Sequence, residues 1–137
     1  MHPRPKSTIF PCTGEKMLVI TAIRPEVIRK IRARGEGTLE LWSVPNVIAA
    51  ESLRPGDVVF LTEEAEEDVK RGVEGIVVRV DRVNVDYRRT GNHYGDEWEV
   101  KAARMRVSLV GTARVSQVTG GRTLVANVDM HDHLIIG

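Results

Sequence analysis

The segments RPGDVVFLT, residues 54–62, and GVEGIVVRV, residues 72–80, decide the fold of this chain. A Pro-Gly-Asp turn precedes the apolar run of the first segment, and a Gly-x-x-Gly turn precedes that of the second. Proline presets the backbone angle at the first corner of a turn, and glycine accepts the positive angle that follows. Runs rich in β-branched residues favour strands. The two segments therefore predict barrel strands over residues 57–61 and 76–80, joined by a polar helical turn over residues 64–71.

Length and composition bound the class of protein. The 137 residues suffice for one domain, and 42% hydrophobic with 28% charged residues is typical of a soluble globular protein. Cys12 is the single cysteine, which excludes an intrachain disulfide and a multi-cysteine metal site and favours a reducing cytoplasm. No run approaches the roughly 18 apolar residues of a membrane span, so we predict a cytoplasmic protein without membrane association.

The N-terminal segment differs from the rest of the chain. Residues 1–16 contain three prolines and no hydrophobic period, which predicts an extended arm. Residues 17–137 are predicted to form a single domain. Because Met17 stands directly before the first predicted strand, whether the arm belongs to the protein depends on where translation begins.

The chain before and after the two turns predicts further strands and a helix. Residues 18–23 form an apolar run and residues 38–43 alternate between apolar and polar, which predicts a strand in each. Residues 45–53 predict a short helix. Residues 111–118 and 123–128 predict a final hairpin with a Gly-Gly turn.

Residues 24–31 predict another short helix. Pro25 suits its first position and Glu26 suits the positive end of the helix dipole. The aliphatic residues of this segment recur at helical spacing on one face, and Gly35 lies beyond the end. The remaining surface is rich in arginine, which predicts an amphipathic helix with a basic outer face.

Two long strands change face midway. The apolar positions of residues 76–80 are even-numbered, whereas those of residues 83–87 are odd-numbered, so a bulge or bend is predicted near Asp81 and Arg82. Residues 98–110 show the same change near Ala102. Strands that change face in this way favour a small coiled barrel over a flat sandwich.

The pattern resembles the PUA-like superfamily, in particular its ASCH type. The resemblance rests on SVPN at residues 43–46 leading a helix, on residues 54–61 and on residues 75–80, and it covers about residues 17–128. More narrowly, the chain is similar to a family of small archaeal proteins. The resemblance implies an α+β fold, a β-pseudobarrel of five or six strands with one or two short flanking helices. It also implies binding of RNA or of a modified nucleotide.

Basic residues supply the candidate binding site. Those of residues 24–34 and those at the solvent-facing positions of residues 104–106 are predicted to line one basic surface. The alternative is that these cations pair with the acidic run at residues 63–68. A polar loop over residues 88–96 is either a nucleic-acid contact or a solvated hairpin tip. The candidate RNA- or ligand-binding residues are Arg24, Arg29, Lys30, Arg88, Arg89, His93, Tyr94, Arg104 and Arg106.

The tryptophans and the C-terminal Asp and His residues are further candidates for a functional role. Trp42 and Trp98 are predicted to be core residues rather than stacking platforms. Asp129, His131 and His133 share one side of an extended strand, where they would suit a divalent metal ion, a solvated terminus or an oligomer interface. No phosphate-binding loop, dinucleotide fingerprint or nucleophile elbow occurs in the sequence, so no cofactor is predicted.

The sequence therefore predicts a domain that binds RNA or a nucleotide-containing ligand in the cleft between barrel and helices. Bacterial ASCH enzymes that deacylate a modified cytidine use a lysine, a threonine and a glutamate, and no matching set is identified here, so a non-enzymatic role is favoured. A nucleoside-directed hydrolase, using a set such as Lys101, Thr62 and Glu74, is the rival. A small metal-binding or scaffold protein is the third interpretation, and a homodimer is left open.

Overall fold

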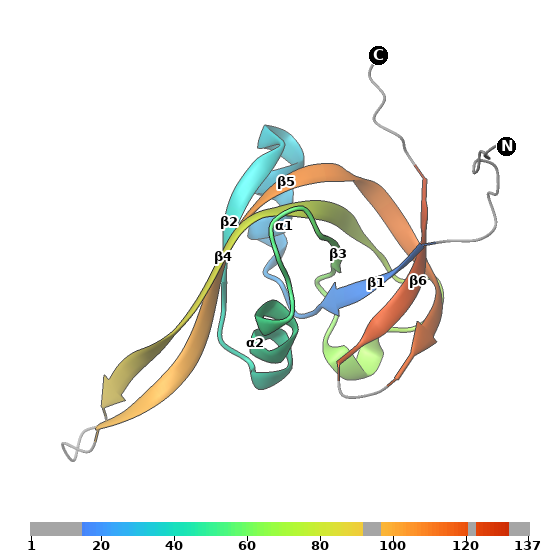
Figure 1. Ribbon diagram of the computed structural model, residues 1–137. Coiled ribbons are helices and arrows are strands. Elements are labelled where there is room, and N and C mark those ends of the chain that lie inside the picture. The colour runs from blue at the N-terminus through green and yellow to red at the C-terminus, as the bar shows by residue number, and fades with distance from the viewer. Residues whose placement is uncertain (1–14, 92–96, 121–122, 132–137) are drawn as a thin grey trace, which may run out of the picture.

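The computed structural model describes residues 15–91, 97–120 and 123–131, and of residues 87–91 and 97–100 it describes the backbone alone. Within this part, six strands, two α-helices and one short 3-10 helix follow one another along the chain (Figure 1). The elements are β1 (Glu15–Ile20), α1 (Pro25–Arg34), β2 (Glu36–Leu41), α2 (Val44–Glu51), β3 (Val58–Leu61), η3 (Glu66–Asp68), β4 (Glu74–Gly91), β5 (Glu97–Thr119) and β6 (Val125–Met130).

The six strands form one sheet that closes into a ring. Their order is β2-β5-β4-β3-β1-β6, and β6 also pairs with β5, which closes the sheet. β1 and β3 run parallel, and the other pairs are antiparallel. The predicted α+β pseudobarrel with two short helices is confirmed. β5 makes the closure possible because, at 23 residues, it is long enough to pair with β2, β4 and β6 in turn (Figure 1).

The two turns that start the barrel strands are confirmed, and the first is hydrogen-bonded to the strand that follows the second. Gly56 has a positive φ of 100°, and the Asp57 carboxylate accepts a hydrogen bond from the Arg54 N–H at 2.9 Å. The Gly56 N–H donates to the Val80 carbonyl at 2.7 Å, and the Val80 N–H donates to the Asp57 carbonyl at 2.8 Å. Gly72, with a φ of 94°, provides the corresponding bend before β4.

The predicted bulge near Asp81 is confirmed, because the β4–β5 register shifts between Val80 and Arg82. The predicted change of the buried face near Ala102 occurs without a bulge, since pairing is regular there while Ala102 and Ala103 are both buried. The extra residues of β5 are Val110 and Ser116. The predicted separate strands over residues 98–110 and 111–118 are one strand. A bulge turns the face of a strand without ending its hydrogen bonding, so the sequence pattern showed a break where the backbone has none.

Two clusters of buried side chains lie on opposite faces of the β3–β1 region. One contains the inward residues of both helices, with Ile20, Leu61 and Val78 of the sheet. The other fills the barrel interior around the fully buried ring of Phe60. β1, β3 and β4 are therefore buried on both faces, which explains their nearly continuous apolar runs.

Several element ends differ from the predicted ones by a few residues. β1 starts at Glu15, inside the segment assigned to the arm, and pairs there with Val128; residues 1–14, with Cys12, lie outside the described residues. α1 ends at Arg34, and Gly35 terminates it as predicted. The helical turn predicted for residues 64–71 is the shorter η3. Among the described helices, none has the length and apolar character needed to cross a membrane.

Asp81, the bulged residue, gives the fold a pH dependence. A hydrogen bond from the Ser108 hydroxyl, together with the guanidinium of Arg79, lowers the pKa of Asp81 below its usual range. The stabilisation is therefore complete above the unfolded pKa, about 3.9, and is lost as the pH falls through the lower folded pKa. We expect Asp81→Asn to flatten the fall in stability below about pH 4, measured by urea unfolding across the acid range. Asp68→Asn is the control, and parallel curves for wild type and Asp81→Asn would contradict this assignment.

Candidate functional site

α1 carries the densest set of exposed cations in the described chain. Ile28 and Ile31 are buried against the sheet, and Gly35 ends the helix with a φ of 80°. The opposite face is therefore left to basic residues, which form no ion pair within the described residues: Arg29, Lys30, Arg32 and Arg34. Arg24, at the helix start, pairs with Glu26 at 3.8 Å, but both side chains are more than half exposed, so this pair holds the guanidinium weakly.

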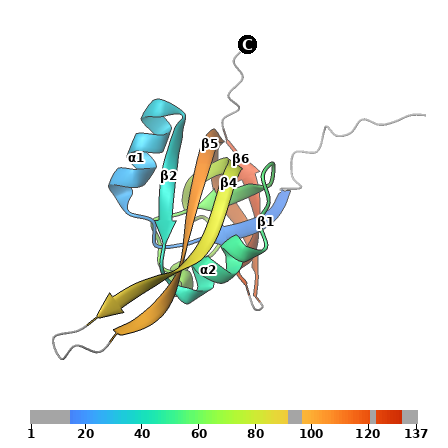
Figure 2. The ribbon, with the colours of Figure 1, turned by 60° about the vertical axis from the view of Figure 1, so that its left-hand side comes forward.

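Three hollows run along α1 and share lining residues. The first, of about 270 Å³, lies between the start of α1, the end of β2 and the start of α2. Val27 joins it to a second hollow of about 350 Å³, which Arg106 of β5 also lines. Lys30 and Arg34 join that one to a shallow third hollow on the outer face of the helix. Because neighbouring hollows share lining residues, the basic residues of α1 border one depression made of all three. α1 itself lies beside β2 (Figure 2).

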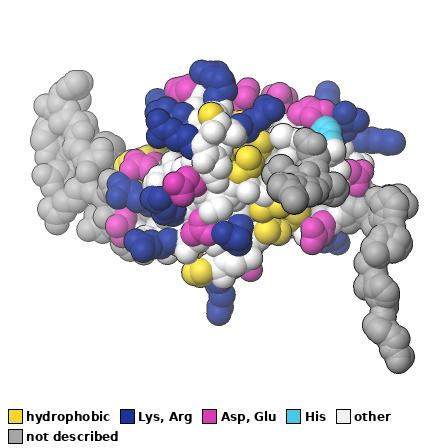
Figure 3. Space-filling view, turned by 90° about the horizontal axis from the view of Figure 1, so that it is seen from above, with side chains coloured by type: hydrophobic (Ala, Val, Ile, Leu, Met, Phe, Trp, Pro, Cys, Tyr) yellow, Lys and Arg dark blue, Asp and Glu magenta, His cyan; other side chains and the backbone are white. Residues whose placement is uncertain are grey.

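Arg104 and Arg106 lie beside this depression but are paired. Arg104 contacts Glu40 at 2.6 Å and Arg106 contacts Glu36 at 3.5 Å, in each case across the β2–β5 pairing. The alternative expected from the sequence, pairing with residues 63–68, is not observed for the described cations. Figure 3 shows Lys and Arg interspersed with Asp and Glu on the face seen from above. Within the described residues, Arg104 and Arg106 are thus ion-paired, whereas Arg29, Lys30, Arg32 and Arg34 of α1 are not.

The first hollow is held in shape by Asn46. The Asn46 side chain, 6% exposed, accepts from the Thr21 N–H at 3.1 Å and donates to the Thr21 carbonyl at 2.9 Å. Ser43 caps α2 by accepting from the Asn46 N–H at 3.4 Å. These bonds fix the start of α2 against the end of β1. Beside them Ala22 adopts a left-handed φ of 56°, which is unusual for a non-glycine residue.

Trp42 lines the same hollow, and the prediction that it is a core residue is wrong. Its side chain is 48% exposed. Leu39 and Leu41 face the core, so Trp42 has the outward parity and follows the last residue of the strand. The side chain of Trp98 lies outside the described part of the structure.

The predicted contact loop is only partly described. Arg88 and Arg89 belong to β4, whose backbone is described there, whereas their side chains are not. His93 and Tyr94 lie outside the described residues. The binding role of this loop therefore stays a prediction.

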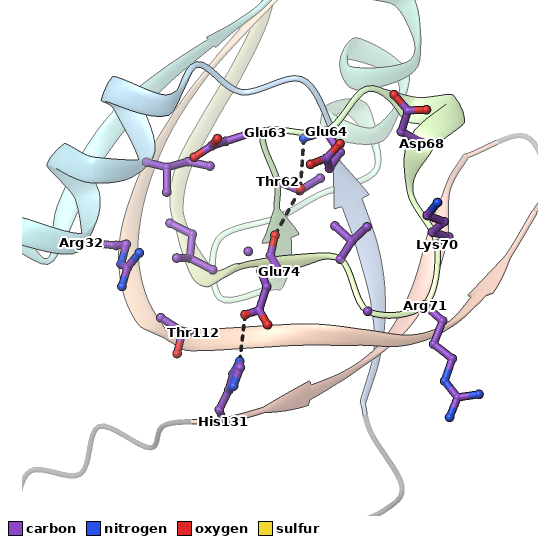
Figure 4. A pocket seen from close by; sticks show the side chains of 15 residues that line it. Arg32, Thr62, Glu63, Glu64, Asp68, Lys70, Arg71, Glu74, Thr112 and His131 are labelled. Atoms are coloured by element: carbon purple, nitrogen blue, oxygen red, sulfur yellow. Dashed lines mark hydrogen bonds and ion pairs between the residues drawn. The ribbon is translucent and has the colours of Figure 1, made fainter.

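A separate cleft of about 730 Å³ opens between α1, the loop before β4 and the end of β6. Glu74 turns its carboxylate toward His131, whose Nε2 lies 3.1 Å from the Glu74 Oε1 (Figure 4). Arg114 Nε donates to the other carboxylate oxygen at 3.0 Å. Both glutamate oxygens are thus occupied, and the lining is mixed in charge.

The three residues suggested for a hydrolase do not lie together in one site. The Thr62 hydroxyl donates to the Glu74 carbonyl at 3.3 Å and is fully buried, so it has a structural contact there. Lys101 instead pairs with Glu51 of α2, toward the far end of the β4–β5 pairing. The set of Lys101, Thr62 and Glu74 therefore does not form one site.

The candidate metal ligands are also divided. Asp129 belongs to β6 and lies opposite Arg114 in register, and His131, just after the strand, pairs with Glu74. His133 lies outside the described residues. No group of three or more His, Cys, Asp or Glu residues suited to a metal ion is found in the described ranges.

Sequence reasoning missed two residues of the first hollow. Asn46 carried a usable signal, because an asparagine in the first turn of a helix after Ser-x-Pro is placed to bond neighbouring backbone. Trp42 also carried a signal, because along an alternating strand it points to the side opposite Leu39 and Leu41. Arg32 and Arg34 belonged to the predicted basic segment but were not among the candidate binding residues.

The comparisons with known proteins agree with the extent of this fold. A relative in the archaeon Methanocaldococcus jannaschii, named "Uncharacterized protein MJ0105", is 31% identical over 77 residues. That stretch covers 56% of this chain and 49% of the relative, about half of its length. A family model described as "Protein of unknown function (DUF473)" matches residues 15–128, from the first residue of β1 into β6. The chain therefore belongs to the DUF473 family.

Proposed function

We propose that the protein binds RNA and holds one unpaired nucleotide in the hollow between α1, α2 and the end of β2. The observation that carries this proposal is the exposed ring of Trp42 on the wall of that hollow. Aromatic side chains stack on unpaired bases, and each such contact contributes roughly 1–3 kcal/mol. The hollow's volume of about 270 Å³ suits part of one nucleotide rather than a larger ligand.

The basic residues of α1 are placed to bind phosphates of the same RNA strand. Arg24 lines the hollow with Trp42, and Arg29, Lys30 and Arg34, which have no ion pair within the described residues, border the depression that continues from it. Guanidinium groups grip phosphate oxygens, and a row of cations follows a backbone without reading its sequence. The arrangement favours single-stranded RNA, with affinity from α1 and a base contact from Trp42.

The resemblance to the PUA-like superfamily supports the same class of ligand. That resemblance implies RNA or modified-nucleotide binding beside the barrel, and SVPN at residues 43–46, which carries part of it, includes the Ser43 cap and the buried Asn46. The site inferred from side chains and the ligand implied by the resemblance therefore agree.

The proposal predicts a defined change in salt dependence. For single strands, log K falls with log salt with a slope of about −0.7 per neutralised phosphate. We expect the double variant Arg29→Gln/Lys30→Gln to bind a labelled single-stranded RNA more weakly and to reduce that slope by about 1.4, because two cations no longer meet phosphates. Fluorescence anisotropy over a salt series measures both quantities.

Lys16→Gln/Arg54→Gln is the matched control, since it removes the same charge from exposed positions outside α1 and the β2–β5 pair. It should leave the slope unchanged. Equal slopes for both double variants would mean that RNA does not lie along α1. Undetectable RNA binding by the wild-type protein at low salt would overturn the proposed function.

A further inference from the structure

β4 and β5 continue beyond the barrel as a two-stranded ribbon. β3 pairs with β4 only as far as Arg79, and β2 pairs with β5 only as far as Ala103. From Arg82 to Gly91, β4 therefore has β5 on one side and no described strand on the other, and the ribbon projects away from the barrel (Figures 1 and 2). A two-stranded ribbon alone is marginally stable in water.

Several features that protect edge strands from pairing with another chain are missing from the free edge of β4. Ten positions, Arg82 to Gly91, pair with β5 in unbroken register, so no bulge interrupts them, and none is proline or lysine. An edge of this length presents a row of backbone N–H and C=O groups that another strand can pair with. Its charged residues then decide which strand fits.

We propose that this edge pairs antiparallel with the same edge of a second copy, about a two-fold axis centred on Tyr87. Such an axis, normal to the sheet, sets residues at equal distances before and after Tyr87 opposite each other and keeps them on one face. Asp86 of each copy then stands opposite Arg88 of the other. Oppositely charged residues directly across a strand pair are stabilising.

Other centres are less suitable. Centring the axis on Asp86 or Arg88 sets that charge against its own copy, which is destabilising. Centring it on Asn84 matches Arg82 with Asp86, but the pairing then meets the end of the β3 region after a few residues. The Tyr87 centre leaves Val83 to Gly91 free to pair along their whole length.

The pairing joins two ribbons into one four-stranded sheet. It uses the β4 edge, whereas α1 lies beside β2 on the other side of β5, so the depression with Trp42 stays open. The inference is thus independent of the proposed RNA binding. Because edge pairing buries little side-chain surface, the dimer belongs among the weaker interfaces.

Sedimentation equilibrium over the micromolar to hundred-micromolar range tests the pairing. We expect the wild type to dimerise, and Asp86→Arg or Arg88→Asp to weaken the dimer at least about tenfold by creating two like-charged pairs. The double variant Asp86→Arg/Arg88→Asp restores the opposite charges and should return the dissociation constant to within about threefold of wild type. Glu67→Arg, on the exposed η3, is the control.

Thermal unfolding of each variant establishes that the fold is retained. A wild type that stays monomeric throughout the range would overturn the proposal, as would a dimer indifferent to all three charge variants. Hydrogen exchange adds a separate outcome. Amides of residues 82–91 that gain protection only when RNA is added would assign the ribbon to nucleic acid and reject self-pairing.

Discussion

Replacing Asn46 with alanine is expected to lower the free energy of unfolding by about 3 kcal/mol, because it removes two buried hydrogen bonds at once. The Asn46 amide satisfies both the N–H and the carbonyl of Thr21, which is itself 5% exposed. Alanine would leave both backbone groups buried without partners, at roughly 1–3 kcal/mol each. Urea unfolding monitored by circular dichroism measures the change.

Asn84→Ala is the matched control for this prediction. Asn84 is exposed on β4, and its side chain makes no hydrogen bond within the described structure, so its loss should change stability by less than about 0.5 kcal/mol. A similar effect for the two asparagine variants would contradict the role given to Asn46. It would mean that the Asn46 hydrogen bonds do not hold the start of α2 in place, and therefore do not set the shape of the hollow beside Trp42.

Gly75→Ala is expected to destabilise the fold by about 3 kcal/mol, at the upper end of the range for overpacked cores. A Cβ at this position would lie 2.3 Å from the Leu61 carbonyl oxygen and 2.6 Å from Cζ of Phe60. Neither neighbour can withdraw easily, because the first is backbone in the β3–β4 pairing and the second is the fully buried ring of the barrel interior. The position requires glycine for close approach rather than for backbone angle.

The comparison for this variant is Gly120→Ala, where an added Cβ meets no atom within 4 Å. Its unfolding midpoint in urea should stay near that of wild type, whereas that of Gly75→Ala should fall clearly. If Gly75→Ala unfolds at the wild-type midpoint, β3 and β4 are not packed as closely at this point as described.

Much of the fold followed from local sequence chemistry. The turns at residues 54–57 and 72–75, and the change of face at Asp81, are set by residue type and parity, and all appear where predicted. The continuity of β5 did not, because a bulge at Val110 has the same sequence pattern as a strand break. Pairing across the bulge depends on Val77 and Val78, at the opposite end of the β4–β5 hairpin.

The candidate site was less accessible to prediction. The exposed position of Arg29 and Lys30 on α1 followed from helical spacing. The pairing of Arg104 with Glu40 did not, because it depends on the β2–β5 register, which no local pattern specifies. Trp42 was misassigned because residue type was given more weight than parity. The wrong assignment matters most, since that ring carries the proposed function.

The fluorescence of Trp42 on titration with RNA reports directly whether a base stacks on its ring. In a Trp98→Phe background Trp42 is the one remaining tryptophan of the sequence, and stacking with a base quenches indole emission. If a base stacks on Trp42, single-stranded RNA should quench this emission saturably. RNA binding should weaken about tenfold or more in Trp42→Ala and be largely retained in Trp42→Phe. Unchanged emission, together with equal RNA affinity for wild type and Trp42→Ala, would contradict this stacking.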